Sequence, residues 1–371
     1  MIRIAVTGVG VVTGAVTGGW AEITAYLDDR ACGDRACGAP GSVVAGSASP
    51  ALPAGGLSQA RVAADPATTV EPAALAALVD EGEARRLSRA CQFAVAAGRI
   101  ALADAGLDAA GGLGLVIGTE FGDLRSTIGF VDGYLSRGPQ GLSALLFPNT
   151  VMNTMAATTA IAVRARELSL TLNAPTVAGE LAIARAAAAV RSGRVDAALA
   201  GGVDELNPLL VNILDEMGAG AEARGEGAGF VVLESLPAAR ARGARILGEI
   251  AGAAWRALAA RPYGIGRGTG SRAIAAALEQ AATQPGAIGR VFASTSGDEP
   301  RDRWEDALLD AALAPHRPPR AAMSALVGRH SGAAALSLAA AVRSAGDGAP
   351  ALVHAVARGG THVALVVRTL T

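Results

Sequence analysis

The stretch Thr171–Gly202, TLNAPTVAGELAIARAAAAVRSGRVDAALAGG, predicts a strand, a tight turn, a helix and a second strand in immediate succession. The turn brings the side chain of Thr176 to the start of the helix. Many enzymes place a nucleophile at such a point, because the positive end of a helix stabilises developing negative charge. Threonine is a weak nucleophile unless a base lies beside it. The segment therefore predicts an elbow suited to catalysis but occupied by a poorly suited residue.

The composition places the chain among globular proteins. It has 371 residues, of which 51% are hydrophobic and 18% are charged, so it can bury a large core. The formal net charge of -1 argues against a nucleic-acid partner and against binding to an acidic membrane surface. All 32 basic residues are arginine, which excludes a lysine Schiff base or a catalytic lysine ammonium.

The three cysteines, Cys32, Cys37 and Cys91, are odd in number and fit no zinc-binding spacing. We therefore expect reduced thiols in a cytoplasmic protein that holds no metal and no other cofactor. The apolar start MIRIAVTGVGVVTG is broken by glycines, so it predicts a buried strand and turn rather than a signal peptide. No apolar run reaches membrane-spanning length without Arg, Asp or Glu.

Helical and strand patterns alternate along the chain. Residues 83–107 have helical spacing that ends at Gly106, a residue suited to a helix C-terminus. Residues 290–298 predict a strand, and residues 31–65, rich in Ala, Gly, Pro and Ser, predict a long surface loop. The alternation predicts an α/β fold with buried parallel strands.

Two common kinds of site, a dinucleotide-binding site and a hydrolytic triad, fit the sequence poorly. The glycines of TGVGVVTG (residues 7–14) resemble a dinucleotide-binding fingerprint, but that fingerprint needs a helix opening directly at the glycines. A tight strand-to-loop turn is the favoured interpretation. A hydrolytic triad needs a histidine base beside a Ser or Cys nucleophile, and no G-x-S-x-G elbow accompanies the histidines. The four histidines are His316, His330, His354 and His362.

Five motifs occur in order along nearly the whole chain: VTGVGVVTG…W, NTVMNTMAA, DAALAGGVDE, GEGAGFVVLES…ARARGARI and GRHSGAAA. Together they resemble the β-ketoacyl synthases of the thiolase superfamily. The resemblance implies a thiolase-like five-layered αβαβα sandwich that works as a dimer. It also implies two similar ketosynthase-like halves within one compact unit, which we expect at residues 1–240 and 241–371.

A ketosynthase of this family uses a Cys that carries the acyl chain as a thioester and two His that decarboxylate the malonyl unit. In register, the three positions fall on Thr176, Ser294 and Arg329. Thr176 lacks the acidity of Cys, and Ser294 cannot replace an imidazole near neutral pH. Arg329 does not deprotonate and so cannot act as a base. The resemblance therefore implies a scaffold whose catalytic residues are all lost.

Neighbouring motif positions are partly kept. Asp302 and Glu305 hold the family register after Ser294, whereas Ser324 stands where the family has Lys. Arg358 stands where a gating Phe is usual, and His330 lies one residue away from the second His position.

The resemblance also assigns residues to the tunnel for the growing chain. Phe121 falls where catalytic homologues place an apolar residue at the end of the acyl pocket. Leu146 and Phe147 fall where family members reach across the dimer axis. We expect further lining from Leu124, Thr127 and Ile128. Bulky side chains there would stop the chain, because overlap in a packed tunnel costs about 1–3 kcal/mol. Ordinary core packing is the alternative for Phe121 and Leu146.

The whole pattern is similar to the chain-length factor of type II polyketide synthases, the ketosynthase-like β subunit. That resemblance implies a heterodimer with a catalytic ketosynthase, and an acyl carrier protein that delivers the polyketide chain. Many aromatic-polyketide factors carry Gln at the Thr176 position and have a longer stretch at residues 214–224, so a reducing, polyene-forming system is favoured at least equally. Two alternatives stay open: a stand-alone ketosynthase-like acyltransferase with an altered nucleophile, and a homodimeric binding protein.

Overall fold

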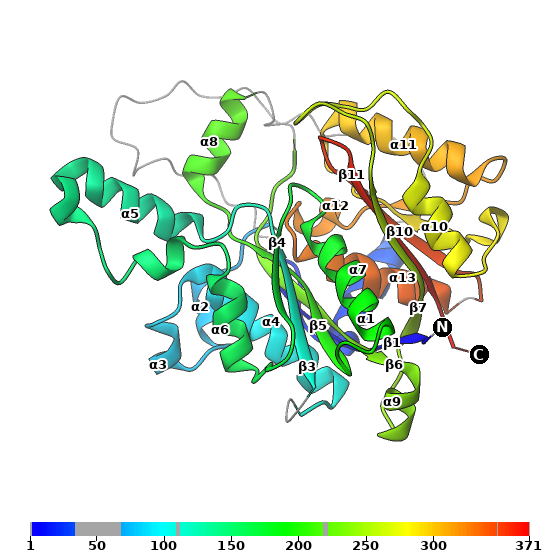
Figure 1. Ribbon diagram of the computed structural model, residues 1–371, viewed down its shortest axis with the longest axis horizontal. Coiled ribbons are helices and arrows are strands. Elements are labelled where there is room, and N and C mark those ends of the chain that lie inside the picture. Colours follow the sequence, from blue (N-terminus) through cyan, green and yellow to red (C-terminus); the bar gives the residue numbers. More distant parts are fainter. Residues whose placement is uncertain (1, 34–67, 109–111, 218–221, 347, 371) are drawn as a thin grey trace.

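The computed structural model describes residues 2–33, 68–108, 112–217, 222–346 and 348–370 (Figure 1). The surface loop predicted for residues 31–65 lies almost wholly outside these ranges, so it stays a prediction. Its first three residues belong instead to the end of helix α1 (Trp20–Gly33). Cys37 lies outside the described residues, whereas Cys91 is a buried free thiol.

The N-terminal half of the sheet contains five long strands in the order β4-β3-β5-β6-β1. β3 pairs in parallel with β4 and with β5, and the β5–β6 and β6–β1 pairs are antiparallel. The strands are β1 (Ile4–Thr13), β3 (Leu113–Thr119), β4 (Ser169–Asn173), β5 (Ala197–Asp204) and β6 (Gly227–Ser235). A short strand, β2 (Thr17–Gly18), pairs with β1.

The C-terminal half repeats this arrangement in the order β7-β11-β10-β8-β9. Here β8 pairs in parallel with β9 and β10, and the β7–β11 and β11–β10 pairs are antiparallel. The strands are β7 (Gly248–Ala257), β8 (Arg290–Phe292), β9 (Arg320–Ala321), β10 (Ala351–Val356) and β11 (Thr361–Arg368). The two halves therefore share one topology, which supports our proposed division between residues 1–240 and 241–371.

The two halves are joined by a contact between their edge strands and by two helices packed between their sheets. A short antiparallel contact between β1 and β7, at residues 4–6 and 248–250, makes one continuous sheet. Two helices, α7 (Ala178–Arg191) and α13 (Ala333–Ala345), lie between the two sheet halves (Figure 1). Both are alanine-rich and buried almost all round, as expected for helices that meet a sheet on each face.

Further helices cover the outer faces. α4 (Arg89–Ala105) packs on the N-terminal half, and α10 (Arg272–Gln280) and α11 (Glu299–Leu313) pack on the C-terminal half. The result is the thiolase-like five-layered αβαβα sandwich, so the predicted fold is confirmed. α4 ends at Gly106 in the left-handed conformation, as its sequence predicts.

Other helical segments connect these layers. They are α2 (Pro72–Ala76), α3 (Glu81–Ala84), α5 (Leu124–Arg137), α6 (Thr154–Ala162), α8 (Pro208–Glu216), α9 (Leu236–Ala241) and α12 (Ser324–Val327). Three 3₁₀ turns are η1 (Gly138–Gly141), η2 (Phe147–Thr150) and η3 (Pro285–Ala287). Within the described ranges, no helix has the length and apolar content to span a membrane.

The predicted buried parallel strands are present, for example as the pair β3–β5, within a mixed sheet that also has antiparallel pairs such as β1–β6 and β7–β11. One sequence expectation needs correction. The strand predicted for residues 290–298 ends at Phe292. Beyond it, the backbone N–H groups of Ser294 and Ser296 donate to the carboxylates of Glu305 and Asp302, so they are unavailable to a neighbouring strand.

The contact between the two central helices predicts the effect of one substitution. A Cβ added at Gly179 on α7 would lie 2.1 Å from the backbone oxygen of Ser331, at the start of α13. We expect Gly179→Ala to lower the free energy of unfolding by about 1–3 kcal/mol, because neither backbone can move freely. Gly286→Ala, at a site with open space around it, is the matched control. Urea denaturation of both variants checks this, and equal stability would contradict it.

Candidate functional site

Thr176 occupies a strained elbow between β4 and α7. Its backbone φ of 65° lies in the left-handed region, where a β-branched residue is rarely found. The elbow fits tightly against strand β3, since a Cβ at Gly118 would lie 2.1 Å from the oxygen of Ala178. The chain therefore keeps the backbone of a nucleophile elbow while its side chain is a threonine.

The structure brings the three predicted catalytic positions together. Thr176, Ser294 and Arg329 line one small cavity of about 30 Å³. The rest of its lining is Glu180, Ala293, Met323, Ser324, His330, Ala333 and Ser337. A cavity of this size holds only about one or two water molecules.

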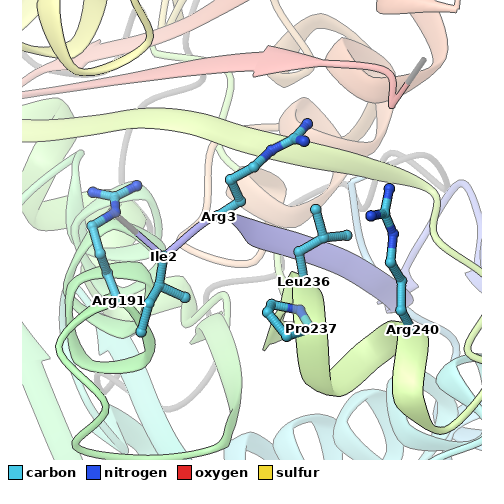
Figure 2. Close-up of a pocket in the computed structure, with 6 residues that line it drawn as sticks. All are labelled: Ile2, Arg3, Arg191, Leu236, Pro237 and Arg240. Carbon is cyan, nitrogen blue, oxygen red and sulfur yellow. The ribbon is translucent and has the colours of Figure 1, made fainter.

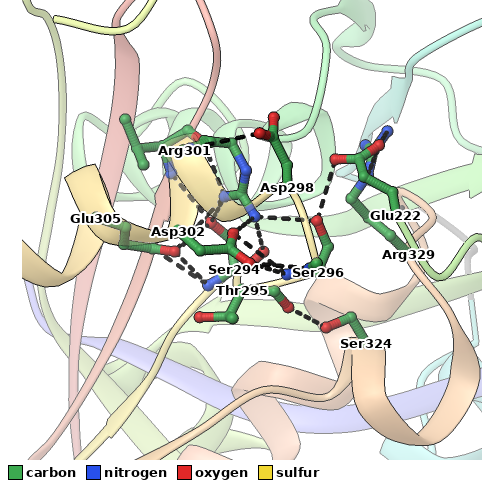
Figure 3. Close-up of polar contacts among 12 residues, drawn as sticks. Glu222, Ser294, Thr295, Ser296, Asp298, Arg301, Asp302, Glu305, Ser324 and Arg329 are labelled. Atoms are coloured by element: carbon green, nitrogen blue, oxygen red, sulfur yellow. Dashed lines mark hydrogen bonds and ion pairs between the residues drawn. The ribbon is translucent and has the colours of Figure 1, made fainter. Parts of the chain in front are cut away.

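The hydroxyl of Ser294 is fully occupied (Figure 3). Its Oγ donates to Glu305 Oε2 at 2.9 Å and accepts from Arg301 Nη1 at 2.8 Å. The backbone N–H of Val356 also donates to it, at 3.3 Å. These partners fix the side chain in place, so Ser294 neither accepts a proton nor contacts a substrate in this arrangement.

Arg301 is the buried cation of this region and is fully shielded from solvent. Its guanidinium donates to the backbone oxygen of Ser294 at 2.7 Å, to Ser296 Oγ at 3.0 Å, and to Asp302 (Figure 3). It also lies 3.5 Å from Glu305 Oε2. The guanidinium therefore lies directly beside the short Ser294 side chain, where the family's longer histidine would need room.

Glu305 links Arg301 to a buried histidine. Its Oε1 lies 2.9 Å from His354 Nδ1, and both side chains are fully buried. Burial by itself would raise the pKa of the Glu305 carboxyl, but the hydrogen bond from His354 and the charge of Arg301 hold that pKa below its usual value. The carboxylate thus stays ionised and acts as a structural partner.

Arg329 belongs to a second buried group, which we call the Arg–Glu cluster: Glu120, Glu222, Arg224 and Arg329. Arg329 Nη1 lies 2.5 Å from Glu120 Oε2, and its Nη2 lies 2.9 Å from Glu222 Oε2. Arg224 Nη2 also reaches Glu222, at 2.5 Å. Burial disfavours the charge on Arg329, but the two carboxylates outweigh that effect and raise its pKa. It therefore stays cationic.

His330 lines the cavity without a hydrogen-bond partner on either ring nitrogen in the described part of the chain. Burial lowers its pKa to about 4, so the imidazole is neutral at pH 7. Glu180, on the first turn of α7, also faces this cavity, and burial raises its pKa to about 7. Neither residue is held in contact with Thr176 by any hydrogen bond among the described residues.

Two further motif positions are tied into ion pairs or hydrogen bonds. Arg358 binds Asp298 with two hydrogen bonds, both at 2.5 Å. Ser324, at the position of the family's lysine, donates to the backbone oxygen of Thr295 (Figure 3). Both interactions hold the loop that carries Ser294.

The predicted tunnel residues lie around α5 and η2. Phe121 is partly buried beneath Arg224, whose guanidinium carbon is 5.6 Å from the ring centre, and it lines a cavity of about 10 Å³. Phe147 is 57% exposed and its ring lies 5.9 Å from that of Phe130. The others are half-buried: Leu124, Thr127, Ile128 and Leu146. Their lining of a tunnel stays a proposal.

A larger cavity lies elsewhere. It has a volume of about 720 Å³ and is lined by Ile2, Arg3, Arg191, Leu236, Pro237 and Arg240 (Figure 2). Arg191 closes α7 at the end opposite Thr176, about 20 Å away along a helix of this length. Arg3 is already paired with Glu249, and Arg191 donates to Gln280. This cavity is therefore separate from the elbow.

Sequence reasoning missed several residues of the site. Glu120, and the neighbouring pair Glu222 and Arg224, lie far from Arg329 in the chain, and only the fold brings them to it. Arg301 lies inside the motif that follows Ser294, so the sequence alone could have indicated a cation close to Ser294. Among the described residues, the structure contains no group of three or more His, Cys, Asp or Glu suited to a metal ion.

Comparisons with known proteins agree with the fold and the elbow. The model of the β-ketoacyl synthase N-terminal domain matches residues 3–239. A Streptomyces virginiae protein described as "Putative polyketide beta-ketoacyl synthase 1" is 32% identical over 286 residues, which cover 68% of this chain and 67% of that protein. A 3-oxoacyl-(acyl-carrier-protein) synthase 2 of Synechocystis is 29% identical over 265 residues, 64% of each chain. The chain belongs to the β-ketoacyl synthase family.

Two solved structures are similar to this chain over its whole length. The ishigamide ketosynthase/chain length factor is 26% identical with a TM-score of 0.77, and the match covers 100% of both chains. The structure of a type II polyketide synthase acyl carrier protein in complex with its ketosynthase, AntDE:AntF, is 16% identical with a TM-score of 0.74, again over 100% of both chains. The second likeness shows the fold alone.

The buried charges around Ser294 predict a strong effect on stability. Arg301→Met leaves Asp302 and Glu305 without their buried cation. We expect a loss of about 3–5 kcal/mol in the free energy of unfolding, because an unpaired buried charge is costly. Arg303→Met is the control on the same helix, where Arg303 pairs with Glu299 in solvent and we expect a change below about 0.5 kcal/mol. Similar losses in the two variants, measured by urea denaturation, would disprove this role of Arg301.

The stability of the protein also depends on pH through His362. This histidine is fully buried, and burial together with the nearby His354 lowers its pKa to about 4. The unfolded chain binds the proton near pH 6.5, so stability falls as the pH drops from about 6.5 towards 4, by roughly 1.4 kcal/mol per pH unit. We expect His362→Gln to lower the slope by this amount, while the contribution of the similarly shifted His330 remains, whereas Val363→Ala keeps the full slope. Urea denaturation at several pH values checks this, and parallel curves for all three proteins would refute it.

Proposed function

We propose that this chain is a non-catalytic chain-length factor: the ketosynthase-like subunit of a type II polyketide synthase, working in the cytoplasm beside a catalytic ketosynthase. The observation that carries the proposal is the state of the three catalytic positions. Thr176 has no hydrogen-bonded base among the described residues, Ser294 is saturated by three partners, and Arg329 is a permanent cation between two carboxylates. The fold of a condensing enzyme is kept without its chemistry.

An exposed apolar face supports a partner subunit. We define this face as Val131, Tyr134, Leu135, Leu142, Leu145, Phe147, Val151 and Met152, which are 37–88% exposed. They lie on α5 and on the segment that follows it, which projects from the body of the molecule (Figure 1). Contiguous apolar surface of this kind marks a protein interface. We assign it to a second subunit of ketosynthase fold.

Most of the proposed tunnel residues lie on the same elements as this face, and Phe147 belongs to both sets. Leu124, Thr127 and Ile128 lie on α5, and Leu146 and Phe147 lie where the chain enters η2. Half-buried or, for Phe147, exposed in this chain alone, these side chains would be enclosed once a partner covers α5. We propose that they then limit the length of the polyketide chain, which an acyl carrier protein delivers. The likeness to the ishigamide ketosynthase/chain length factor supports a ketosynthase partner. Thr176, where many aromatic-polyketide factors carry Gln, keeps a reducing, polyene-forming system at least equally favoured.

The stand-alone acyltransferase finds less support. Acyl transfer at Thr176 requires a base within hydrogen-bond reach and space for an acyl group. The cavity beside Thr176 is about 30 Å³, and the neutral imidazole of His330 makes no hydrogen bond among the described residues.

Assembly is the direct test of the proposal. Co-expression with a ketosynthase encoded beside it, followed by size-exclusion chromatography with mass detection, should give a one-to-one complex. A stable homodimer that ignores the ketosynthase would contradict the proposal and favour a homodimeric binding protein.

The apolar face predicts which substitutions break that complex. We expect Leu135→Asp and Leu145→Asp, at positions 75% and 88% exposed, to weaken it at least about tenfold, because each would bury a charge in an apolar interface. Tyr263→Asp, at a position 74% exposed outside this face, is the control and should leave the complex intact. Titration by calorimetry measures the affinities, and unchanged binding by both variants would exclude this face as the interface.

A further inference from the structure

The cavity at the start of β1 has the size of a small-molecule site. Its volume is about 720 Å³, and ligand pockets typically measure about 300–1,000 Å³. Its lining comes from the residues before β1, from the end of α7 and from α9 (Figure 2). The proposed function uses none of these residues. We call this space the basic cavity, and it is lined by Ile2, Arg3, Arg191, Leu236, Pro237 and Arg240.

The charge of the basic cavity comes from its arginines, because none of its six described lining residues is acidic. Arg3 lies between Arg191 and Arg240 (Figure 2). Its Nε and Nη2 donate to Glu249, at 2.8 and 2.6 Å. The same carboxylate accepts from Arg368 Nε at 2.9 Å. Glu249 is therefore shared by two arginines and has no charge left to balance a third.

Arg191 lacks an anionic partner within the described part of the chain. Its Nη1 donates to the neutral amide oxygen of Gln280 at 3.1 Å, and its Nε is buried without a hydrogen-bond partner. Burial lowers the pKa of the Arg191 guanidinium, and the charge of Glu249 opposes this only in part. A cation that is withdrawn from water without an anion beside it is unfavourable. Arg191 would therefore gain from an anion in the cavity.

The C-terminal end of α7 does not supply that anion. A helix C-terminus carries a partial negative charge, which contributes typically about 0.3–1 kcal/mol to a nearby cation. The backbone oxygens of residues 188–190 already accept hydrogen bonds from the N–H groups of residues 192–194. The end of the helix is thus capped by its own backbone, and the charge of Arg191 remains largely unbalanced.

Arg240 adds a second unpaired cation. It is exposed on α9, and no described carboxylate lies within ion-pair distance of it. The group formed by Arg3, Arg191, Arg240, Arg368 and Glu249 therefore has an excess of three positive charges. A phosphate monoester carries about two negative charges near neutral pH, and a diphosphate ester carries more. The number and the spread of the arginines match a diphosphate better than a single phosphate.

Apolar side chains complete the lining of the basic cavity. They are Ile2, Leu236 and Pro237, and Ile2 is 41% exposed (Figure 2). An apolar group of a ligand would cover this surface, which is favourable by about 25 cal/mol for each Å² removed from water. Apart from the arginines, no described lining residue has a polar side chain that could select a nucleobase. The lining therefore favours an apolar organic group next to the anion.

We propose that the basic cavity binds the diphosphate ester of a small apolar alcohol, with the diphosphate along the arginines and the apolar group against Ile2 and Pro237. The inference goes beyond the proposed function, because the site takes no part in setting the length of a polyketide chain. α9 lies on the opposite side of the molecule from α5 (Figure 1), so a subunit bound at the apolar face leaves the basic cavity uncovered.

Isothermal titration calorimetry with dimethylallyl diphosphate tests this assignment on the purified chain or on its complex with a ketosynthase. Arg191→Gln/Arg240→Gln should bind at least about tenfold more weakly than the unaltered chain. The matched control is Arg256→Gln/Arg272→Gln, which removes the same charge at two exposed arginines outside the cavity and should bind like the unaltered chain. Equal weakening in both variants would indicate diffuse attraction to a basic surface and would overturn the proposal.

Related ligands test the two parts of the proposed ligand separately. Inorganic pyrophosphate should bind at least about fivefold more weakly than dimethylallyl diphosphate, because it lacks the apolar group. Equal affinities would contradict the role of the apolar lining. ADP should also bind more weakly, and tighter binding of ADP would assign the cavity to a nucleotide instead. Absence of any heat of binding at about 1 mM dimethylallyl diphosphate would reject the site altogether.

The variants are expected to fold, since neither Arg191 nor Arg240 forms an ion pair with a described residue. Circular dichroism and size-exclusion chromatography check this. If the double variant does not fold, Arg240→Gln alone changes only an exposed side chain of α9 and should bind at least about threefold more weakly. Unchanged binding by that variant would overturn the proposal. Binding to the purified chain needs no ketosynthase, so failure of the heterodimer leaves this result readable.

Discussion

The close contact of α7 and α13 is the constraint on which the site depends. Both helices lie between the two sheet halves, and Gly179 lets the start of α7 touch the backbone of Ser331 at the start of α13. Asp204 at the end of β5 accepts hydrogen bonds from the N–H and hydroxyl of Ser331 and from the N–H of Glu120. Two helix N-termini and the ends of two strands thus meet at one point, where the positive helix ends favour the carboxylates gathered there.

In this region, buried charged side chains lie around the positions where a condensing enzyme has its catalytic groups. A condensing site needs a nucleophile, a proton acceptor and space for an acyl group. Here the space is filled by Arg329 and its carboxylates on one side, and by Arg301 beside Ser294 on the other. Buried ion pairs of this kind add little net stability over apolar packing, yet they fix one arrangement strongly because any broken pair is costly. The polar side chains around the small cavity are held by these ion pairs, while the apolar face around α5 is left exposed.

The sequence predicted the scaffold well because the fold's periodic features are local. The strand–elbow–helix–strand of residues 171–202 and the helix end at Gly106 both follow from spacing and glycines. The three catalytic positions were placed by motif register, and the structure gathers them around one cavity. α5 and α8 were not predicted, and among the described residues each is mostly exposed, with a single buried residue, Ser126 in α5 and Leu210 in α8. The Arg–Glu cluster was missed because its members are up to about two hundred residues apart in the chain. A local sequence pattern does not predict such a contact.

We propose above that this chain is the non-catalytic partner of a condensing enzyme and carries no acyl group itself. The most direct test incubates the co-purified complex with an acyl carrier protein thioester and measures the intact mass of each subunit. The account predicts one acyl group on the ketosynthase and an unchanged mass for this chain. An acyl group on this chain, mapped to Thr176, would contradict the account and assign the chemistry to the elbow threonine.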